Sequence, residues 1–309
     1  MRKFIVFLFV ICISIASVIS CNNKGTTGPT IPPSRTEKTN VAFRDDFDGT
    51  EINKDVWTLC YQEYGKDGNS PTWNRFFDNT EGWENVRVED GYLKLKANYA
   101  PNPGAGENKQ FKTGGVYTID RYGPGTRVSV KAALVEGNGQ KQLGSKFNIK
   151  GAFPAVWYYP LGTKNPWPAD GEIDLMEWVT SNPDQAWLTI QCLRKDGSSR
   201  SVTADKQGVN KGINMATWHT YTCDIIKDKV ILYIDGTKAL EFTPTNPPDQ
   251  KWYPYNDVYQ YLILNASYQN GSWGPGPDKA DSSNYEMWVD WVEITEIDPN
   301  TEPTAPTFN

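Results

Sequence analysis

The feature of this 309-residue chain that most suggests chemistry is a group of three acids, Glu172, Asp174 and Glu177. The residues between them are apolar, so the group is not a solvated run of charge. Like charges this close repel one another, and proteins retain such crowding mainly where carboxyl groups bind a metal or transfer protons. Crowding also raises a carboxyl pKa, as a general acid near neutral pH requires. The group therefore predicts a functional site.

The three acids can act together only on a kinked strand. Side chains alternate along a regular strand, so Glu172 and Asp174 would share a face and Glu177 would point away. One extra residue, a β-bulge around Leu175-Met176, turns Glu177 back onto the acidic face. On a helix the two glutamates would lie about 140° apart around the axis and could not cooperate. The β-branched and aromatic neighbours also favour a strand.

Two carboxyl groups about 5–5.5 Å apart suit a glycosidase that retains the anomeric configuration. One attacks the anomeric carbon while the other protonates the leaving oxygen. We assign Glu172 as nucleophile, Glu177 as general acid/base, and Asp174 as the middle residue that orients and tunes Glu172. Clustered carboxylates could instead bind calcium, but apolar residues interleaved along a strand make a poor calcium loop. The pattern favours catalysis.

Composition excludes other kinds of site and partner. The chain has a single histidine, His219, which argues against a multi-histidine zinc site and leaves any Ser-His-Asp device dependent on that residue. We expect a structural role or a place at the rim of the site for His219. The formal net charge is −6 and the sequence pI is about 5.0, so no basic face is expected for nucleic acid.

The first residues resemble an export signal. Arg2 and Lys3 precede an apolar stretch that is short for a membrane span, so residues 1–20 are interpreted as a removed signal peptide. The sequence V-I-S before Cys21 resembles a bacterial lipobox, in which the cysteine becomes the acylated first residue. Ordinary signal cleavage nearby is the alternative. Residues 21–40 are rich in Pro, Gly and Thr and predict a flexible tether. We therefore expect an extracytoplasmic lipoprotein anchored to a membrane.

The remainder of the chain has the pattern of a β protein. Two hairpins are predicted, with turns at Asp90-Gly91 and Asp235-Gly236. No stretch predicts a long amphipathic helix, so many short strands with turns between them indicate a sandwich or barrel. Further strands are expected at Thr126–Ala132, Phe153–Tyr159, Glu172–Val179, Trp187–Leu193, Thr220–Ile226, Tyr259–Asn265 and Met287–Ile294.

The run W-P-A-D-G-E-I-D-L-M-E at 167–177 resembles the active-site signature of glycoside hydrolase family 16, in its longer E-x-D-x-x-E form. The resemblance extends from Phe43 to Ile294. It implies an all-β catalytic domain at residues 41–297, a β-jelly-roll sandwich of two curved antiparallel sheets with a concave cleft, followed by a tail at 298–309. It also implies endo-hydrolysis of a β-linked polysaccharide with retention. The supporting matches are FRDDFDG at 43–49, TGGV at 113–116, FPAVW at 153–157, WHTY at 218–221 and WVDWVEI at 288–294.

Departures from the family pattern concern the substrate. Many laminarinases carry an Asn-Asn-Glu-rich stretch where residues 73–83 stand here, and the strand after the catalytic one often has a histidine that residues 188–193 lack. Residues 263–273 resemble β-1,3-glucanases and O-glycan-active members. We expect a β-1,3- or mixed-linkage glucan as substrate. The alternatives are an endo-β-galactosidase acting on host O-glycans or algal galactans, and a non-catalytic surface glycan-binding protein.

Aromatic and polar residues near the acids are candidates for sugar binding. The indoles of Trp157 and Trp167 flank the acid strand and can stack on a sugar face while donating through N–H. Trp273 lies in a glycine-rich stretch and is a third candidate, although several of the twelve tryptophans must serve core packing. The polar candidates are Arg75, Asn265 and Gln191.

No cofactor is required for this chemistry. The family resemblance allows a structural calcium ion away from the cleft, held by Asp46 and Asp290. Once Cys21 is modified, only Cys60, Cys192 and Cys223 remain in the mature chain, too few for a disulfide scaffold, so buried thiols are expected. We expect a monomer whose partners are its polysaccharide and, through the anchor, a membrane.

Overall fold

Strands make up almost all of the regular structure in the described part of the chain. The computed structural model describes residues 42–60, 84–101, 110–137, 143–144, 146–160, 167–193, 197–204, 208–243, 254–269 and 273–308. The helices within these ranges are single 3-10 turns, including η4 (Pro254–Asn256) and η5 (Asp281–Ser283). None of the described helices has the length and apolar character needed to span a membrane. The all-β prediction is confirmed.

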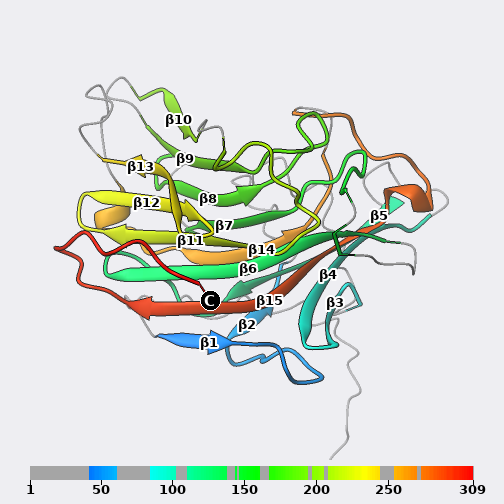
Figure 1. Cartoon of the computed structure of the whole chain (residues 1–309), viewed down its shortest axis with the longest axis horizontal. Helices are drawn as coiled ribbons and strands as arrows, with labels where there is room; N and C mark the ends of the chain where they lie inside the picture. Colours follow the sequence, from blue (N-terminus) through cyan, green and yellow to red (C-terminus); the bar gives the residue numbers. More distant parts are fainter. Residues whose placement is uncertain are drawn as a thin grey trace, which may run out of the picture. The chain divides into compact units, whose positions relative to one another are not determined.

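The strands follow one another in a continuous antiparallel order that folds into two layers (Figure 1). The first layer contains β10 (Ser199–Thr203), β9 (Trp187–Leu193), β8 (Glu172–Glu177), β7 (Ala155–Tyr159), β14 (Tyr261–Ala266), β5 (Phe111–Thr118) and β2 (Trp57–Leu59). The second contains β13 (Thr237–Phe242), β12 (Lys229–Ile234), β11 (His219–Ile226), β6 (Thr126–Glu136), β15 (Tyr285–Glu296), β4 (Tyr92–Tyr99), β3 (Val86–Glu89) and β1 (Phe43–Asp45). Pairing between β4 and β5 joins the layers, giving the jelly-roll sandwich that the sequence predicts.

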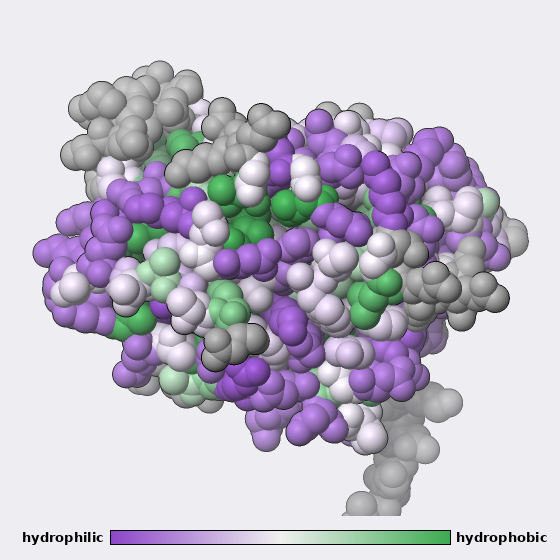
Figure 2. Space-filling model, in the orientation of Figure 1, coloured by the Kyte–Doolittle hydropathy of each residue, from purple (hydrophilic) through white to green (hydrophobic). Residues whose placement is uncertain are grey.

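The main core lies between the layers, where β8 faces β11, β9 faces β13 and β14 faces β15. Alternation along each strand sends one set of side chains inward, such as Ile173 and Met176 from β8 and Val130 from β6. Hydrophilic residues predominate on the surface in view and hydrophobic ones form only small groups (Figure 2). This distribution is the expected result of burying apolar faces against each other.

The first layer also has apolar side chains on the face turned away from this core. They form a second buried cluster, which we call the floor cluster, and four of its members are aromatic. Its strands therefore have near-continuous burial; every residue of β7 and of β14 is buried. The acids of β8 stand beside this cluster on the same face. The floor cluster comprises Cys60, Tyr117, Ala155, Trp157, Tyr159, Tyr261 and Ile263.

Both predicted hairpins are present, and their turns have the expected backbone. Asp90 and Gly91 have φ values of 57° and 78°, and Asp235 and Gly236 have 49° and 77°. Two successive residues with positive φ are typical of the tight turns whose twist matches that of the flanking strands. The three thiols Cys60, Cys192 and Cys223 are free and buried, as predicted.

The C-terminal segment differs from the tail that the sequence predicts, because residues 298–308 pack along the second layer. The Arg127 guanidinium donates to the Thr304 carbonyl at 2.7 Å, and the Lys229 ammonium lies 2.6 Å from the Glu302 carboxylate. Pro306 is buried, with its carbonyl oxygen close to Gly236. The segment is thus part of the folded unit. Its composition suggested a tail because proline and threonine do not reveal which neighbouring side chains will bind their carbonyls.

Candidate active site

The predicted bulge lies in β8 between Asp174 and Glu177. On β9, Thr189 pairs with Asp174 and Trp187 pairs with Glu177, so two residues of β8 stand opposite one of β9. The pairing with β7 shifts register in the same region. The extra residue returns Glu177 to the face that carries Asp174, as the bulge hypothesis requires.

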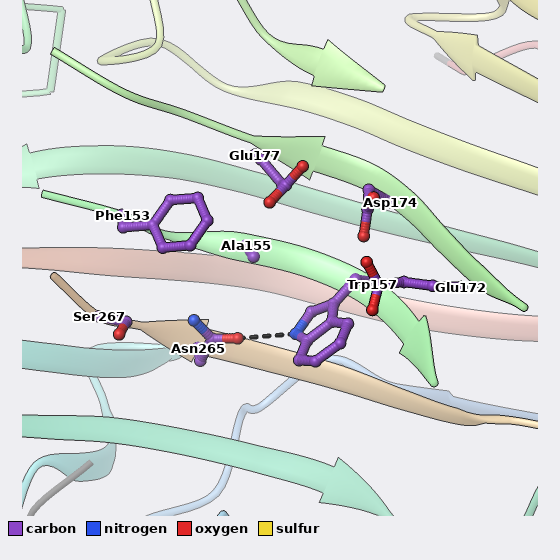
Figure 3. A pocket seen from close by; sticks show the side chains of 8 residues that line it. All are labelled: Phe153, Ala155, Trp157, Glu172, Asp174, Glu177, Asn265 and Ser267. Atoms are coloured by element: carbon purple, nitrogen blue, oxygen red, sulfur yellow. Dashed lines mark hydrogen bonds between the residues drawn. The ribbon is translucent and has the colours of Figure 1, made fainter. Parts of the chain in front are cut away.

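All three acids line one pocket on the outer face of the first layer, and Figure 3 shows their side chains reaching into it from β8. Its empty space, including solvent at the mouth, is about 360 Å³. Strand β7 supplies one part of the wall and β14 another. The lining residues are Phe153, Ala155, Trp157, Glu172, Asp174, Glu177, Asn265 and Ser267.

Glu172 is positioned by a hydrogen bond to its side chain and by the turn that precedes it. The Trp167 indole N–H donates to its carboxylate at 3.1 Å. The residue before it, Gly171, has a φ of 80°, and its amide donates to the Pro168 carbonyl at 3.0 Å. Glycine adopts this left-handed conformation without the steric penalty that other residues incur. The resulting turn places Trp167 next to the start of β8.

The pocket changes the proton affinity of every acid in it. Burial raises the pKa of Glu172 to about 7, while the bond from Trp167 opposes the rise. Burial together with the Glu172 charge raises the pKa of Glu177 to about 8. Burial and the two neighbouring glutamates raise the pKa of Asp174 well above its usual range. At neutral pH the pocket can therefore hold one ionised glutamate beside a protonated one, the charge arrangement of a nucleophile with a general acid.

Two of the predicted binding residues form part of the pocket wall. The Trp157 indole N–H donates to the Asn265 side-chain oxygen at 2.8 Å (Figure 3), and the two residues are only 5% and 4% exposed. Because its N–H is already bonded, Trp157 offers the pocket mainly its ring. Asn265 retains its side-chain NH₂ group as a donor.

The other two predicted tryptophans are among the most exposed large hydrophobic residues described, Trp167 at 44% and Trp273 at 36%. Trp273 meets Trp187 edge to face at 5.2 Å and Phe153 at 5.8 Å. Trp187 is the partner of Glu177 across the strands, so Trp273 belongs to the Glu177 end of the site. Trp167 belongs to the Glu172 end.

Gln191 stands opposite Glu172 in the pairing of β9 with β8, so the two side chains share a face. Its side-chain oxygen accepts a hydrogen bond from Ser201 of β10. Arg75 and Cys21 lie outside the described residues. Three pocket residues that the sequence reasoning did not select are Phe153, Ala155 and Ser267. Phe153 stands in the F-P-A-V-W run that supported the family resemblance, whereas Ser267 gave no signal of its own.

The two acids proposed for calcium do not fit such a site. Asp46 accepts hydrogen bonds from Arg44, the shortest at 2.6 Å, and Asp290 lies 2.8 Å from the Lys131 ammonium. Each carboxylate thus already neutralises a cation. Among the described residues there is no group of three or more His, Cys, Asp or Glu side chains that could hold a metal ion.

His219 lies outside the pocket lining, in agreement with the structural role predicted for it. Its Nδ1 is 2.7 Å from the Asp235 carboxylate, and its Nε2 is 3.1 Å from the Asn214 carbonyl. These contacts tie the start of β11 to the hairpin turn between β12 and β13.

Comparison with known proteins supports the same chemistry. A β-glucanase of Rhodothermus marinus is 25% identical over 233 residues, which are 68% of this chain and 70% of that protein. A solved structure from work on endo-acting O-glycanases of the human gut microbiota, which initiate mucin breakdown, is 30% identical with a TM-score of 0.67 over 83% of this chain and 99% of that one. The laminarinase catalytic domain of Thermotoga petrophila RKU-1 shares the fold, at 21% identity and a TM-score of 0.63 over 84% and 99%.

The family model of glycosyl hydrolases family 16 matches residues 77–293, which is more than half of the chain and includes the whole acid run. The carboxylate pocket on a bulged strand is thus found in a chain whose fold and sequence both match one group of glycoside hydrolases. The chain belongs to glycosyl hydrolases family 16.

Proposed function

We propose that this chain is a retaining endo-glycosidase that hydrolyses internal β-linkages of a β-1,3- or mixed-linkage β-1,3/1,4-glucan. The observation that carries the proposal is the gathering of Glu172, Asp174 and Glu177 into one pocket by the bulge in β8. The β-glucanase relative supports the choice of substrate. A pocket open to solvent also suits a chain that is cut internally rather than from an end.

In the first step Glu177 gives its proton to the glycosidic oxygen while the Glu172 carboxylate attacks the anomeric carbon. The carbon–oxygen bond breaks, the shortened chain leaves as an alcohol, and the sugar stays bound to Glu172 as an ester. In the second step Glu177 takes a proton from water, and the water oxygen displaces Glu172 from the anomeric carbon. Two inversions give net retention of configuration.

The environments of the two glutamates support this division of roles. The Trp167 N–H stabilises a negative charge on Glu172, as a nucleophile needs. No side chain among the described residues donates such a bond to Glu177, and burial together with the Glu172 charge favours its protonated form. Burial and the charges of Glu177 and Glu172 raise the pKa of Asp174 well above its usual range, so Asp174 can keep a proton and donate a hydrogen bond to a neighbouring glutamate. We propose that it orients and tunes Glu172.

We further propose that sugar rings stack on Trp157, Trp167 and Trp273, and that Asn265 and Gln191 donate hydrogen bonds to sugar hydroxyls. Stacking uses the apolar face of the ring against sugar C–H groups. Arg75 remains a proposed contact on the basis of sequence alone. The exposed positions of Trp167 and Trp273, at opposite ends of the acid row, support a bound chain that extends beyond the pocket.

A second substrate class has an observation in its favour. The structure at 30% identity comes from work on endo-acting O-glycanases that initiate mucin breakdown. The direct test is to incubate the protein with laminarin, mixed-linkage glucan, agarose, porphyran and mucin, and to size the oligosaccharides released. We expect laminarin or mixed-linkage glucan to be cut, with the β-anomer of the product formed first in a proton NMR time course. Release from mucin alone would replace the glucan proposal, and an initial α-anomer would refute retention.

The role of Glu172 is tested by Glu172→Ala. Loss of the nucleophile should lower hydrolysis to background while binding of the polysaccharide persists, because the tryptophans are unchanged. Glu296→Ala, at an exposed glutamate at the end of β15, is the matched control and should hydrolyse like the parent. Hydrolysis by Glu172→Ala at the parent rate would show that the nucleophile lies elsewhere. A chain that binds glycan but shows no turnover before any substitution would instead be the non-catalytic binding protein.

We also propose that the chain is exported, cleaved before Cys21 and acylated there, which would place the enzyme outside the cytoplasm on a membrane, as a monomer. The apolar stretch in residues 1–20 and the V-I-S-C sequence support this proposal. Mass spectrometry of the mature N-terminus should find a lipid-modified Cys21. Cys21→Ser should release the protein from the membrane fraction, and retention of that variant would contradict lipid anchoring. Sedimentation of a chain starting at residue 41 should give the monomer mass.

A further inference from the structure

Tyr255 lies in the core beneath the acid pocket and does not line it. It belongs to η4, its side chain is 1% exposed, and its ring meets Phe242 edge to face. Its hydroxyl oxygen lies 2.9 Å from the carbonyl oxygen and 3.2 Å from the amide nitrogen of Glu172. The same hydroxyl lies 2.7 Å from the carbonyl oxygen of Gln191. One side-chain oxygen thus joins the main chains of β8 and β9 where Glu172 and Gln191 pair.

The Tyr255 hydroxyl meets the main chain of Glu172 at the start of its strand. Glu172 is the first residue of β8, and the pairing of β8 with β7 begins only at Ile173. On its other flank Glu172 pairs with Gln191 of β9. The Glu172–Gln191 pair therefore lies at the end of β8, and the Tyr255 hydroxyl bridges the two main chains there.

We propose that Tyr255 is a positioning residue for the nucleophile, and that its hydroxyl fixes the main chain of Glu172 at the distance from the sugar that direct attack requires. The inference rests on the proposed function, since it takes Glu172 as the attacking group. Tyr255 does not line the pocket, so it acts through the main chains that its hydroxyl contacts, chiefly that of Glu172. A shift of about 1 Å at a reacting group can reduce a rate by up to about a hundredfold.

Two other buried tyrosines provide matched controls. Tyr285 is 0% exposed, and its hydroxyl contacts the main chain of Ser267 and, at 3.3 Å, the amide of Phe153. It therefore supports the opposite side of the pocket. Tyr158 is also 0% exposed, but its hydroxyl has no hydrogen-bond partner among the described residues. Each Tyr→Phe change removes one hydroxyl oxygen. In Tyr255 that oxygen contacts the main chain of Glu172, in Tyr285 it contacts main chain elsewhere, and in Tyr158 it has no hydrogen-bond partner among the described residues.

The experiment compares Tyr255→Phe, Tyr285→Phe and Tyr158→Phe by melting temperature, kcat, KM and the pH dependence of kcat/KM. Tyr255→Phe should lower kcat about tenfold or more with KM within about twofold of the parent, and it should move the acidic limb of the pH profile. Tyr285→Phe should lower the melting temperature about as much as Tyr255→Phe does, but its acidic limb should stay at the pH of the parent. Tyr158→Phe should match the parent in kcat and in the pH profile.

An unchanged kcat and acidic limb in Tyr255→Phe would overturn the proposal. So would an equal shift of the acidic limb in Tyr285→Phe, because general loosening of the core would then explain both variants. Amide hydrogen exchange of the peptide spanning 172–177 is a readout that needs no substrate, and it should speed up in Tyr255→Phe more than in Tyr285→Phe. If the parent cuts none of the glycans, the proposed function fails, while the exchange result still decides whether Tyr255 holds this strand.

Discussion

At the scale of single residues, the two glutamates differ because of what each side chain touches. Glu172 receives a hydrogen bond from Trp167, whereas Glu177 experiences the charge of Glu172. The active form requires Glu172 to be ionised and Glu177 to be protonated. With pKa values of about 7 and about 8, this form predominates only between those two values.

We therefore expect a narrow bell-shaped pH profile of kcat/KM. Activity should fall below about pH 7 because Glu172 takes up a proton, and above about pH 8 because Glu177 loses one. Initial rates on the best polysaccharide, measured across pH 5 to pH 10 at low substrate concentration (about a tenth of KM), would check this. A rate that stays flat from pH 5 to pH 7 would contradict the assigned pKa of Glu172.

Raised carboxyl pKa values also imply a stability cost at high pH. The folded chain holds the Glu177 proton up to about pH 8, whereas the unfolded chain releases it near 4.5, so stability falls as pH rises between these values. Glu177→Gln removes this titration and should raise the free energy of unfolding at pH 8 relative to the parent. One pKa unit corresponds to about 1.4 kcal/mol, and water at the pocket mouth reduces the effect, so we expect a gain of about 2 kcal/mol. Denaturant melts at pH 5 and pH 8 measure it; an equal effect at both pH values would contradict it.

The single histidine allows a direct test at another position. Burial opposes a charge on His219, but the hydrogen bond and charge of Asp235 outweigh it and raise the pKa above 6.5. The charged form thus stabilises the fold below pH 6.5, and this contribution is lost as pH rises through the folded-state pKa. An NMR titration of the one imidazole ring should give a midpoint above 6.5, moving back toward 6.5 in Asp235→Asn. A midpoint below 6.5 would show that burial prevails.

At the scale of elements, β8 pairs with its neighbouring strands but departs from regular geometry at two places. The turn at Gly171 starts the strand, and the bulge at Leu175-Met176 turns its second half. The bulge was predictable because acids spaced as Glu172, Asp174 and Glu177 are cannot share one face of a regular strand. The turn could not be predicted from the sequence. The left-handed Gly171 has its effect by placing Trp167 against Glu172, and that contact is visible only in the folded chain.

Gly171→Ala tests the turn. Alanine at a φ of 80° is strained, so the variant should lose about 1 kcal/mol of stability, or about 2–4 °C in melting temperature. It should also lower kcat, because Glu172 follows directly. Gly49→Ala is the control, since Gly49 has no left-handed φ and the nearest atom to an added Cβ lies 3.7 Å away. Equal melting temperatures for the two variants would contradict the strain at Gly171.

At the scale of the whole molecule, the second layer supports the first without contributing to the pocket lining. Residues 298–308 lie along this second layer, attached through Arg127, Lys229 and the burial of Pro306. The ion pairs of this segment are partly exposed, and such pairs contribute little each. Its main contribution is therefore the packing of Pro306 and the bond from Arg127, which is itself paired with the buried Asp224 carboxylate.

Truncation after Ile297 should accordingly lower the melting temperature by about 2–6 °C and leave kcat and KM unchanged. Differential scanning calorimetry and polysaccharide kinetics measure the two effects. Glu302→Ala, which removes only the ion pairs with Lys229 and Lys238, is the control and should shift the melting temperature by less than half as much. A fall in kcat with unchanged stability would mean that the segment reaches the site after all.

The sequence by itself determined the reaction class, the strand-rich fold, the hairpin turns and the three acids with their bulge. These follow from local rules: side-chain alternation, turn chemistry and the repulsion of neighbouring charges. The tertiary structure alone decided that Phe153, Ala155 and Ser267 complete the pocket and that Tyr255 lies beneath Glu172. It also decided that residues 298–308 are packed, and that Asp46 and Asp290 already neutralise cations. Each of these depends on strands distant in sequence coming side by side, and no spacing along one chain segment specifies that.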